Sequence, residues 1–346
     1  MVAENYGKNS IIVDAMGGDH APGEIIRGCI QASRLLDIKI ILIGDEKKIR
    51  SFAIQDNLDI TNLEILNASQ EIEMDESPSE VVRTKRDSSI YLGTKILGEG
   101  KAGAFLSAGN TGAVMACALY NARRIEGIQR PAIAVVLPLA EKRVVLIDAG
   151  ANVDVKPVYL KQFAIMGKAY AETMLSIENP AIGLINVGSE EKKGSEVVVE
   201  AYKLLKNSDL NFKGNVEGRD IFEGKVDVAV CDGFVGNILL KAIEGMANLF
   251  FTEIKNVFLS NFMTKLVTLG LKKPLSRMKR KFDYEEYGGA YLLGVDGLVI
   301  ISHGSSRAKA ISNAIRVAAT GVSMDLVGKI RDEVKIVNKN DRGSEK

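Results

Sequence analysis

The sequence predicts a doubly wound α/β fold, in which a mostly parallel sheet lies between helix layers on both faces. Short apolar runs rich in β-branched residues recur along the 346-residue chain. Most of these runs are continuously apolar instead of alternating, which is typical of strands buried on both faces. Helical patterns separate them, and a βαβα order indicates a doubly wound sheet.

The strands and helices follow one another without an evident linker or repeat. We expect residues 1–336 to form a single α/β domain and residues 337–346 to be a flexible tail. The predicted strands are Ile11–Asp14, Ile38–Ile43, Leu63–Leu66, Ala104–Ser107, Ala132–Leu137, Val144–Asp148, Ile182–Asn186, Val226–Cys231 and Leu298–Ser302. The predicted helices include Gly23–Leu36, Ala113–Asn121, Pro157–Leu175, Ser195–Leu205 and Arg307–Ala319.

Composition and charge exclude several classes of function. The net charge of +1 gives no overall attraction to nucleic acid. Two histidines and three scattered cysteines predict no metal site and no disulfide framework. No apolar run approaches 18 residues and no N-terminal apolar region is present, so we expect a cytoplasmic protein without a spanning segment.

Glycines and short polar side chains follow six of the predicted strands. In doubly wound sheets ligands bind beyond the carboxyl ends of the strands, and a glycine-rich turn that opens a helix binds anions through its free N–H groups. The alternative for any one loop is that its Ser, Thr or Asn merely caps a helix. The loops are Asp14–His20, Ser107–Gly112, Asp148–Asn152, Asn186–Glu190, Asp232–Asn237 and Ser302–Ser306.

The familiar phosphate and nucleophile signatures are absent. There is no Walker loop and no GxSxG elbow. A GxGxxG match at Gly98–Gly103 precedes a predicted strand instead of following one, so we interpret it as a helix end and a turn. The sequence therefore favours chemistry in which a positioned phosphate is itself the nucleophile.

A set of ordered motifs resembles the PlsX family of acyl-[acyl-carrier-protein]:phosphate acyltransferases, over residues 11–332. The motifs are Asp14–Pro22, Ser107–Ala113, Asp148–Asn152, Asn186–Glu190, Glu217–Asp220, Cys231–Asn237 and Tyr287–Ala290. The resemblance implies a three-layer fold similar to those of phosphotransacetylases and isopropylmalate dehydrogenases. It implies transfer of an acyl group from acyl carrier protein to inorganic phosphate, with no organic cofactor. It further implies a homodimer whose acyl-phosphate product feeds phospholipid synthesis through a membrane acyltransferase.

Individual residues in the strand-end loops are candidates for this chemistry. We expect catalytic roles for His20, Asp19 and Lys241, with His20 protonating the departing thiolate or binding phosphate; a loop histidine tied to Asp19 is the alternative. For Arg83 and Lys85 two interpretations are equally open: cationic contacts to the substrate, or part of a solvated loop. The expected phosphate or substrate contacts are Asp14, Gly17, Gly18, Arg83, Lys85, Ser107, Asn110, Thr111, Gly112, Asp232, Asn237, His303, Ser305 and Ser306.

A basic amphipathic segment near residue 260 predicts a helix-turn-helix projection, residues 246–282. Residues 254–282 contain eight bases and no acid, and apolar residues from Phe250 to Leu269 recur at helical spacing. The segment could form a dimer, touch anionic membrane or dock acidic carrier protein. The expected membrane contacts are Leu266, Val267, Leu269, Leu271, Lys272 and Lys273.

Other functions remain open at this point. An NAD-linked dehydrogenase or a CoA-dependent phosphotransacetylase could be built on the same architecture. A non-catalytic module that binds membrane or carrier protein would explain the basic segment, but it would leave the six polar loops without a role.

Overall fold

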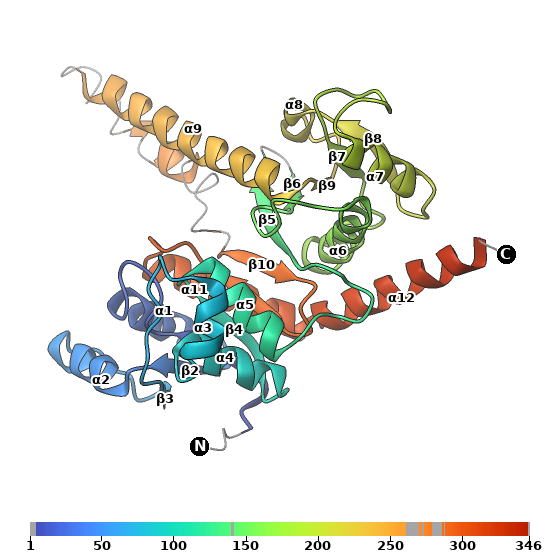
Figure 1. Ribbon diagram of the computed structural model, residues 1–346. Coiled ribbons are helices and arrows are strands. Elements are labelled where there is room, and N and C mark those ends of the chain that lie inside the picture. Colours follow the sequence, from blue (N-terminus) through green and yellow to red (C-terminus); the bar gives the residue numbers. More distant parts are fainter. Residues whose placement is uncertain are drawn as a thin grey trace.

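A computed structural model of the protein describes residues 5–139, 142–260, 270–271, 273–278, 286 and 288–344. Figure 1 shows one continuous sheet with helices on both sides. The sheet has 11 strands in the order β3-β2-β1-β4-β11-β10-β5-β6-β9-β7-β8. The strands are β1 Gly7–Asp14, β2 Lys39–Gly44, β3 Glu64–Asn67, β4 Ala102–Ser107, β5 Ala132–Pro138, β6 Arg143–Ile147, β7 Ile182–Ile185, β8 Phe212–Val216, β9 Val228–Val230, β10 Ala290–Leu293 and β11 Leu298–Ile301.

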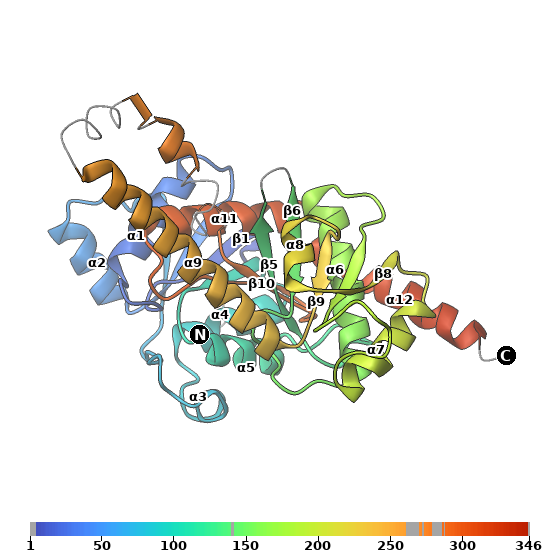
Figure 2. The same cartoon turned by 90° about the horizontal axis from the view of Figure 1, so that it is seen from above.

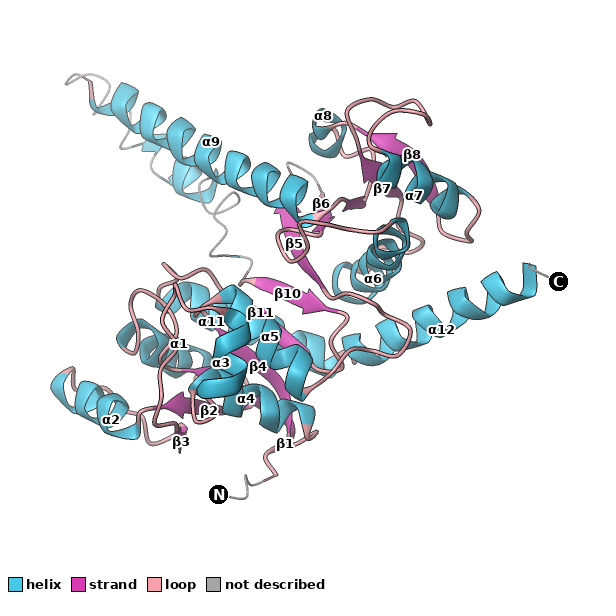
Figure 3. Ribbon diagram, in the orientation of Figure 1, coloured by secondary structure: helices cyan, strands magenta, loops and turns pink. Residues whose placement is uncertain are grey.

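Helices cover both faces of this sheet, as the colouring in Figure 3 makes plain. One buried cluster joins the sheet to α1, α6, α11 and α12, and a second joins the opposite face to α4 and α5. The predicted three-layer α/β fold is therefore confirmed. The helices are α1 Gly23–Ser33, α2 Glu46–Gln55, α3 Pro78–Thr84, α4 Ser89–Gly98, α5 Thr111–Asn121, α6 Pro157–Leu175, α7 Glu196–Lys206, α8 Gly218–Phe222, α9 Gly233–Leu259, α11 Ala308–Ser323 and α12 Leu326–Ser344.

The sheet consists of two parallel halves that run in opposite directions. Strands β3, β2, β1, β4 and β11 are parallel to one another, as are β6, β9, β7 and β8, and antiparallel pairings through β10 and β5 join the halves. Tyr291 of β10 pairs with Ile300 near the end of β11 and with Ala134 of β5, which in turn pairs with Ile147 at the end of β6. The carboxyl ends of both halves therefore meet at the central strands.

All nine predicted strands are present, and two short ones were missed. Strand β8 contains Gly214 at a φ of +97° and alternates polar with apolar residues, so it lacks the continuous apolar run of its neighbours. Strand β10 is four residues long and follows the basic segment. The interpretation of Gly98–Gly103 is confirmed, because α4 ends at Gly98 and Gly100 has a φ of +69°. The predicted boundary at residue 336 is not an end of secondary structure, since α12 continues to Ser344.

Helix α9 projects from the sheet and is hardly covered by the rest of the chain. It has 27 residues, of which two, Gly233 and Gly236, are buried. Figure 1 shows it extending away from the sheet, and Figure 2, seen from above, shows it running from the middle of the molecule toward one side. The predicted projection began at residue 246, but the helix starts at Gly233 and residues 273–278 are helical as well. The predicted membrane contacts Leu266, Val267, Leu269 and Lys272 lie outside the described residues, as does Tyr287.

By length and composition, α9 is the one helix in the described part of the chain that could cross a bilayer. The sequence prediction did not find it, because Lys241, Glu244, Glu253 and Lys255 interrupt its apolar residues. A search for an uninterrupted apolar run therefore misses an amphipathic helix that a search by mean hydropathy finds.

Candidate active site

A cavity of about 1090 Å³ opens where the carboxyl ends of the two half-sheets meet. The loops after β1, β4 and β11 form one wall, and strand β5 with helix α9 forms the other. This is the place at which doubly wound sheets bind ligands. In the described part of the chain, no group of three or more His, Cys, Asp or Glu side chains could hold a metal ion.

Asp14 and Ser107 hold the first two loops together beneath the cavity. Both side chains are buried, and the Ser107 hydroxyl donates to Asp14 Oδ2 at 2.7 Å while accepting the Gly109 N–H at 3.0 Å. Burial raises the pKa of Asp14, and hydrogen bonds from Ser107, Ser89 and the loop amides act against that rise. Both residues were predicted to contact phosphate, but neither lines the cavity and their polar groups bond to the protein itself.

Gly17 and Gly18 allow three loops to touch, and neither lines the cavity as predicted. A Cβ on Gly17 would lie 2.4 Å from Asp14 Oδ2 and 2.6 Å from Gly109 N. Gly18 has a φ of +104°, which L side chains rarely adopt. The next amide, of Asp19, donates to the Gly304 carbonyl at 2.8 Å. The loops after β1, β4 and β11 are thereby fixed to one another.

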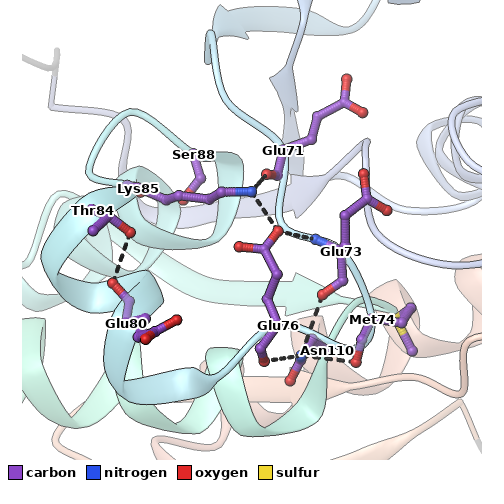
Figure 4. Close-up of polar contacts among 9 residues, drawn as sticks. All are labelled: Glu71, Glu73, Met74, Glu76, Glu80, Thr84, Lys85, Ser88 and Asn110. Atoms are coloured by element: carbon purple, nitrogen blue, oxygen red, sulfur yellow. Dashed lines mark hydrogen bonds and ion pairs between the residues drawn. The ribbon is translucent and has the colours of Figure 1, made fainter.

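Asn110 and Lys85 hold the loop at residues 71–76 against the sheet, as Figure 4 shows. Asn110 caps α5 by accepting the Ala113 N–H at 3.0 Å, and its amide donates to the carbonyls of Met74 at 2.9 Å and Glu76 at 3.0 Å. Lys85 donates to the Glu71 carbonyl at 2.6 Å and pairs with the Glu76 carboxylate. Neither residue lines the cavity, and the phosphate contacts predicted for both stay predictions.

Three further predicted contacts lie away from the cavity lining. Asp232 caps α9, where its carboxylate accepts the Val235 N–H at 2.8 Å. Arg83 is exposed on α3. Gly112 packs against α3, because a Cβ there would lie 2.6 Å from Pro78 Cγ. Asp232 therefore has a structural role as the N-cap of α9, and Gly112 has one in the packing of α5 against α3.

Six predicted residues do line the cavity: Asp19, Thr111, Asn237, Lys241, His303 and Ser306. His20 and Ser305 do not line it, although each is adjacent in sequence to a residue that does. Thr111 begins α5, so its N–H and that of the next residue have no acceptor within the helix. The polar end of the cavity therefore combines side chains from three loops and α9 with the start of a helix.

The His303 ring and the Lys241 ammonium come together at this end. His303 Nδ1 lies 2.8 Å from the Ser305 hydroxyl oxygen and 3.2 Å from the Ser305 backbone nitrogen. Nε2 lies 3.4 Å from Lys241 Nζ, which also forms an ion pair with Glu244 at 2.8 Å. The Lys241 ammonium can only donate, so it places a positive charge beside the His303 ring, and this charge favours an anion over a cation.

Sequence reasoning missed the apolar end of the cavity and one polar residue. Leu240, Ile243, Ala247 and Phe251 recur along α9 at spacings of three and four, and all line the cavity. That spacing is visible in the sequence, but the apolar stripe predicted from it began at Phe250 and was not traced back to Leu240. The polar residue is Ser302, which is 4% exposed, lines the cavity and has no partner for its hydroxyl.

The fold and this cavity together define a class of protein. Anion-binding donors stand at one end of the cavity, an apolar groove lies at the other, and both sit at the carboxyl ends of a doubly wound sheet. This arrangement is typical of an enzyme that brings an anionic reactant to an apolar one.

Solved structures of the same fold include two phosphotransacetylases. The enzyme from Streptococcus pyogenes matches with a TM-score of 0.62 at 19% identity, covering 92% of this chain and 95% of that one. The EutD phosphotransacetylase from Staphylococcus aureus matches with a TM-score of 0.59 at 18% identity, covering 92% and 96%. At these identities the likeness establishes the fold alone.

Sequence comparison establishes the family. The model of a family described as fatty acid synthesis protein matches residues 10–329. A phosphate acyltransferase of Desulfitobacterium hafniense is 49% identical over 94% of this chain and 97% of its own. A phosphate acyltransferase of Desulforamulus reducens is 47% identical over 97% and 99%. The chain belongs to the PlsX family of phosphate acyltransferases and is an acyltransferase of fatty acid synthesis.

Proposed function

We propose that this chain transfers the acyl group of an acyl-[acyl-carrier-protein] thioester to inorganic phosphate, releasing acyl-phosphate and free carrier protein. The observation that carries the proposal is the division of one cavity into an anion-binding end and an apolar groove. Phosphate would bind between Lys241 and His303, close to Thr111 at the start of α5. The acyl chain would lie along α9, past Leu240 and Ala247.

In the proposed step, an oxygen of the bound phosphate attacks the carbonyl carbon of the thioester. A carbon–oxygen bond forms, the carbonyl oxygen takes up negative charge, and the carbon–sulfur bond then breaks. The electron pair leaves with sulfur, and the released thiolate takes a proton from solvent. Donors fixed before the reaction stabilise the developing charge without having to reorganise.

This step needs no protein nucleophile and no dedicated general acid. A thiol has a pKa of about 8.5, so a thiolate leaves far more readily than an alkoxide would. Bound phosphate is already nucleophilic near neutral pH, and the protein contributes mainly position and electrostatic stabilisation. His20 lies outside the cavity lining, which favours Lys241 and His303 over it for contact with the reactants.

The proposed partners include a second copy of this chain and a membrane surface. Outside the cavity lining, α9 exposes Phe234, Ile238, Leu249 and Val257, each more than half exposed. These exposed apolar side chains support dimerisation through α9, in a cytoplasmic enzyme. Leu271 and Lys273, both described, could meet an anionic bilayer near the turn of the projection and pass acyl-phosphate to a membrane acyltransferase. Flotation of Leu271→Asp with anionic vesicles tests the membrane contact, and undiminished binding contradicts it.

The central test measures free thiol released from palmitoyl-carrier protein, with and without phosphate, while hydroxylamine traps the product. We expect thiol release that depends on phosphate and an equal yield of palmitoyl hydroxamate. A parallel reaction with palmitoyl-CoA distinguishes the carrier: faster turnover of the CoA ester would replace carrier protein as the substrate. No phosphate-dependent release from either thioester would contradict the proposed reaction.

A further inference from the structure

Ser302 stands out because its hydroxyl is buried and has no hydrogen-bond partner in the protein. The residue follows β11, is 4% exposed and lines the cavity. Its Oγ has no acceptor or donor within reach. Burying a hydroxyl without a hydrogen bond costs stability, so a fold retains such a group when something outside the chain bonds to it.

Ser107, at the end of the neighbouring strand, shows how a buried serine hydroxyl is ordinarily satisfied within the protein. The two residues are adjacent across the sheet, and the Ser302 N–H donates to the Ser107 carbonyl at 2.9 Å. The Ser107 hydroxyl donates to Asp14 and is fully satisfied. Ser302 has no such carboxylate beside it, although its backbone is held just as firmly.

The backbone of a glycine lies against the Ser302 hydroxyl. A Cβ on Gly289 would lie 3.1 Å from Ser302 Oγ, and Gly289 has a φ of +98°. Gly289, Ser302 and His303 all line the cavity. Among the described residues, one other buried side chain has an unpartnered polar atom, Asn215 Oδ1, and it does not line the cavity.

We infer that the Ser302 hydroxyl donates a hydrogen bond to the phosphate that reacts in this cavity, alongside Lys241 and next to His303. The inference rests on the proposed function for its ligand and adds a contact that neither the motifs nor the comparisons assign. Ser302 supplies a short neutral donor from the wall of the cavity, whereas Lys241 supplies charge from α9. Together they fix phosphate from two sides, with one oxygen left to attack.

Two variants separate a ligand contact from a structural role. Ser302→Ala removes a hydroxyl that has no partner in the free protein, so its melting temperature should equal or exceed that of the wild type. Ser10→Ala is the matched control, because Ser10 is equally buried but its hydroxyl donates to the Gly7 carbonyl at 2.7 Å, far along β1 from the cavity. Ser10→Ala should therefore melt at a lower temperature while its KM for phosphate is unchanged.

The experiment measures the KM for phosphate, the kcat and the rise in melting temperature with added phosphate, against chloride at the same ionic strength. For Ser302→Ala we expect the KM for phosphate to rise about 10- to 100-fold, as for loss of a hydrogen bond to a charged group. We also expect kcat to change by less than the KM and the phosphate-induced rise in melting temperature to be largely lost. Ser302→Cys carries a weaker donor of similar shape, so its KM for phosphate should lie between those of the wild type and Ser302→Ala.

Either of two outcomes overturns the inference. The first is a KM for phosphate in Ser302→Ala within about 2-fold of the wild-type value, because loss of a hydrogen bond to a charged group predicts a much larger rise in KM. The second is a fall in melting temperature like that of Ser10→Ala, which would mean that the hydroxyl is bonded in the free protein. The melting experiment needs only inorganic phosphate and no acyl donor. It therefore stands even if the proposed acyl transfer fails.

Discussion

The two ends of the cavity are built by different means. At the polar end, Ser107 donates to Asp14 and Asn110 donates to the loop at residues 71–76, and these buried hydrogen bonds hold the loops that carry Thr111 and His303. At the apolar end, side chains of one projecting helix line the groove, and few of its residues are buried. The polar end is thus fixed by the core, whereas the apolar end depends on a helix that makes little contact with the sheet. Chemistry needs position within fractions of an ångström, while an acyl chain needs only an apolar surface of sufficient length.

The largest effect is expected where the two ends meet, at Lys241. Lys241→Ala removes the charged donor beside His303, and we expect kcat/KM for phosphate to fall about 100- to 1000-fold, as for loss of a preorganised donor to developing charge. Thiol release from short and long acyl donors measures it. Lys255→Ala, on the same helix and outside the cavity lining, is the control. If the loss at Lys241 were confined to long acyl chains, this residue would belong to the apolar end.

A smaller, selective effect is expected from filling the groove at Ala247. The cavity follows α9 from Asn237 to Phe251. These residues are 14 positions apart, or about 21 Å at a rise of about 1.5 Å per residue, which is of the same order as a long fatty acyl chain. Ala247→Trp should lower turnover of palmitoyl thioester about 10-fold relative to a short-chain thioester, because the groove is shortened. The KM for phosphate should stay at its wild-type value.

Leu249→Trp provides the comparison for Ala247→Trp, since Leu249 is on the same helix but not in the cavity lining. Chain-length preference should be unchanged in that variant. Equal losses for short and long chains in Ala247→Trp would show that the groove and the polar end are not separable.

The smallest effect concerns the buried network beneath the polar end. Burial raises the pKa of Asp14, so the folded protein binds a proton there more tightly than the unfolded chain does. The resulting stability is fully present below the ordinary aspartate pKa and is lost as the pH rises through the raised value. Asp14→Asn does not titrate. Wild type should therefore gain stability relative to Asp14→Asn as the pH is lowered through this range.

Urea unfolding of both proteins at several pH values measures this difference. Asp148 also has a raised pKa, but it is common to both proteins and cancels in the comparison. A difference in unfolding free energy that does not change with pH would mean that Asp14 titrates at its ordinary value, and that the network at the polar end is open to solvent.

The sequence by itself determined the layers of the fold and the location of the site. A strand that is apolar on both faces can bury its side chains only between two helix layers. Glycine and short polar residues after those strands predicted the loops where the cavity lies. These are local patterns, and they held for all nine predicted strands. The spacing of apolar residues along α9 was a local pattern as well. What those residues face, the cavity wall opposite α9, does not follow from the sequence.

Only the tertiary structure decided which polar groups in those loops face a ligand. Asp14 and Asp19 stand five residues apart in one loop, yet the first is buried against Ser107 and the second lines the cavity. Ser107 and Ser302 end neighbouring strands, and only the first has a carboxylate beside it. A side chain's hydrogen-bond partner can lie far away along the chain, 93 positions away for Asp14 and Ser107. Residue type and spacing cannot fix whether such a partner exists, because that depends on how distant strands align in the sheet.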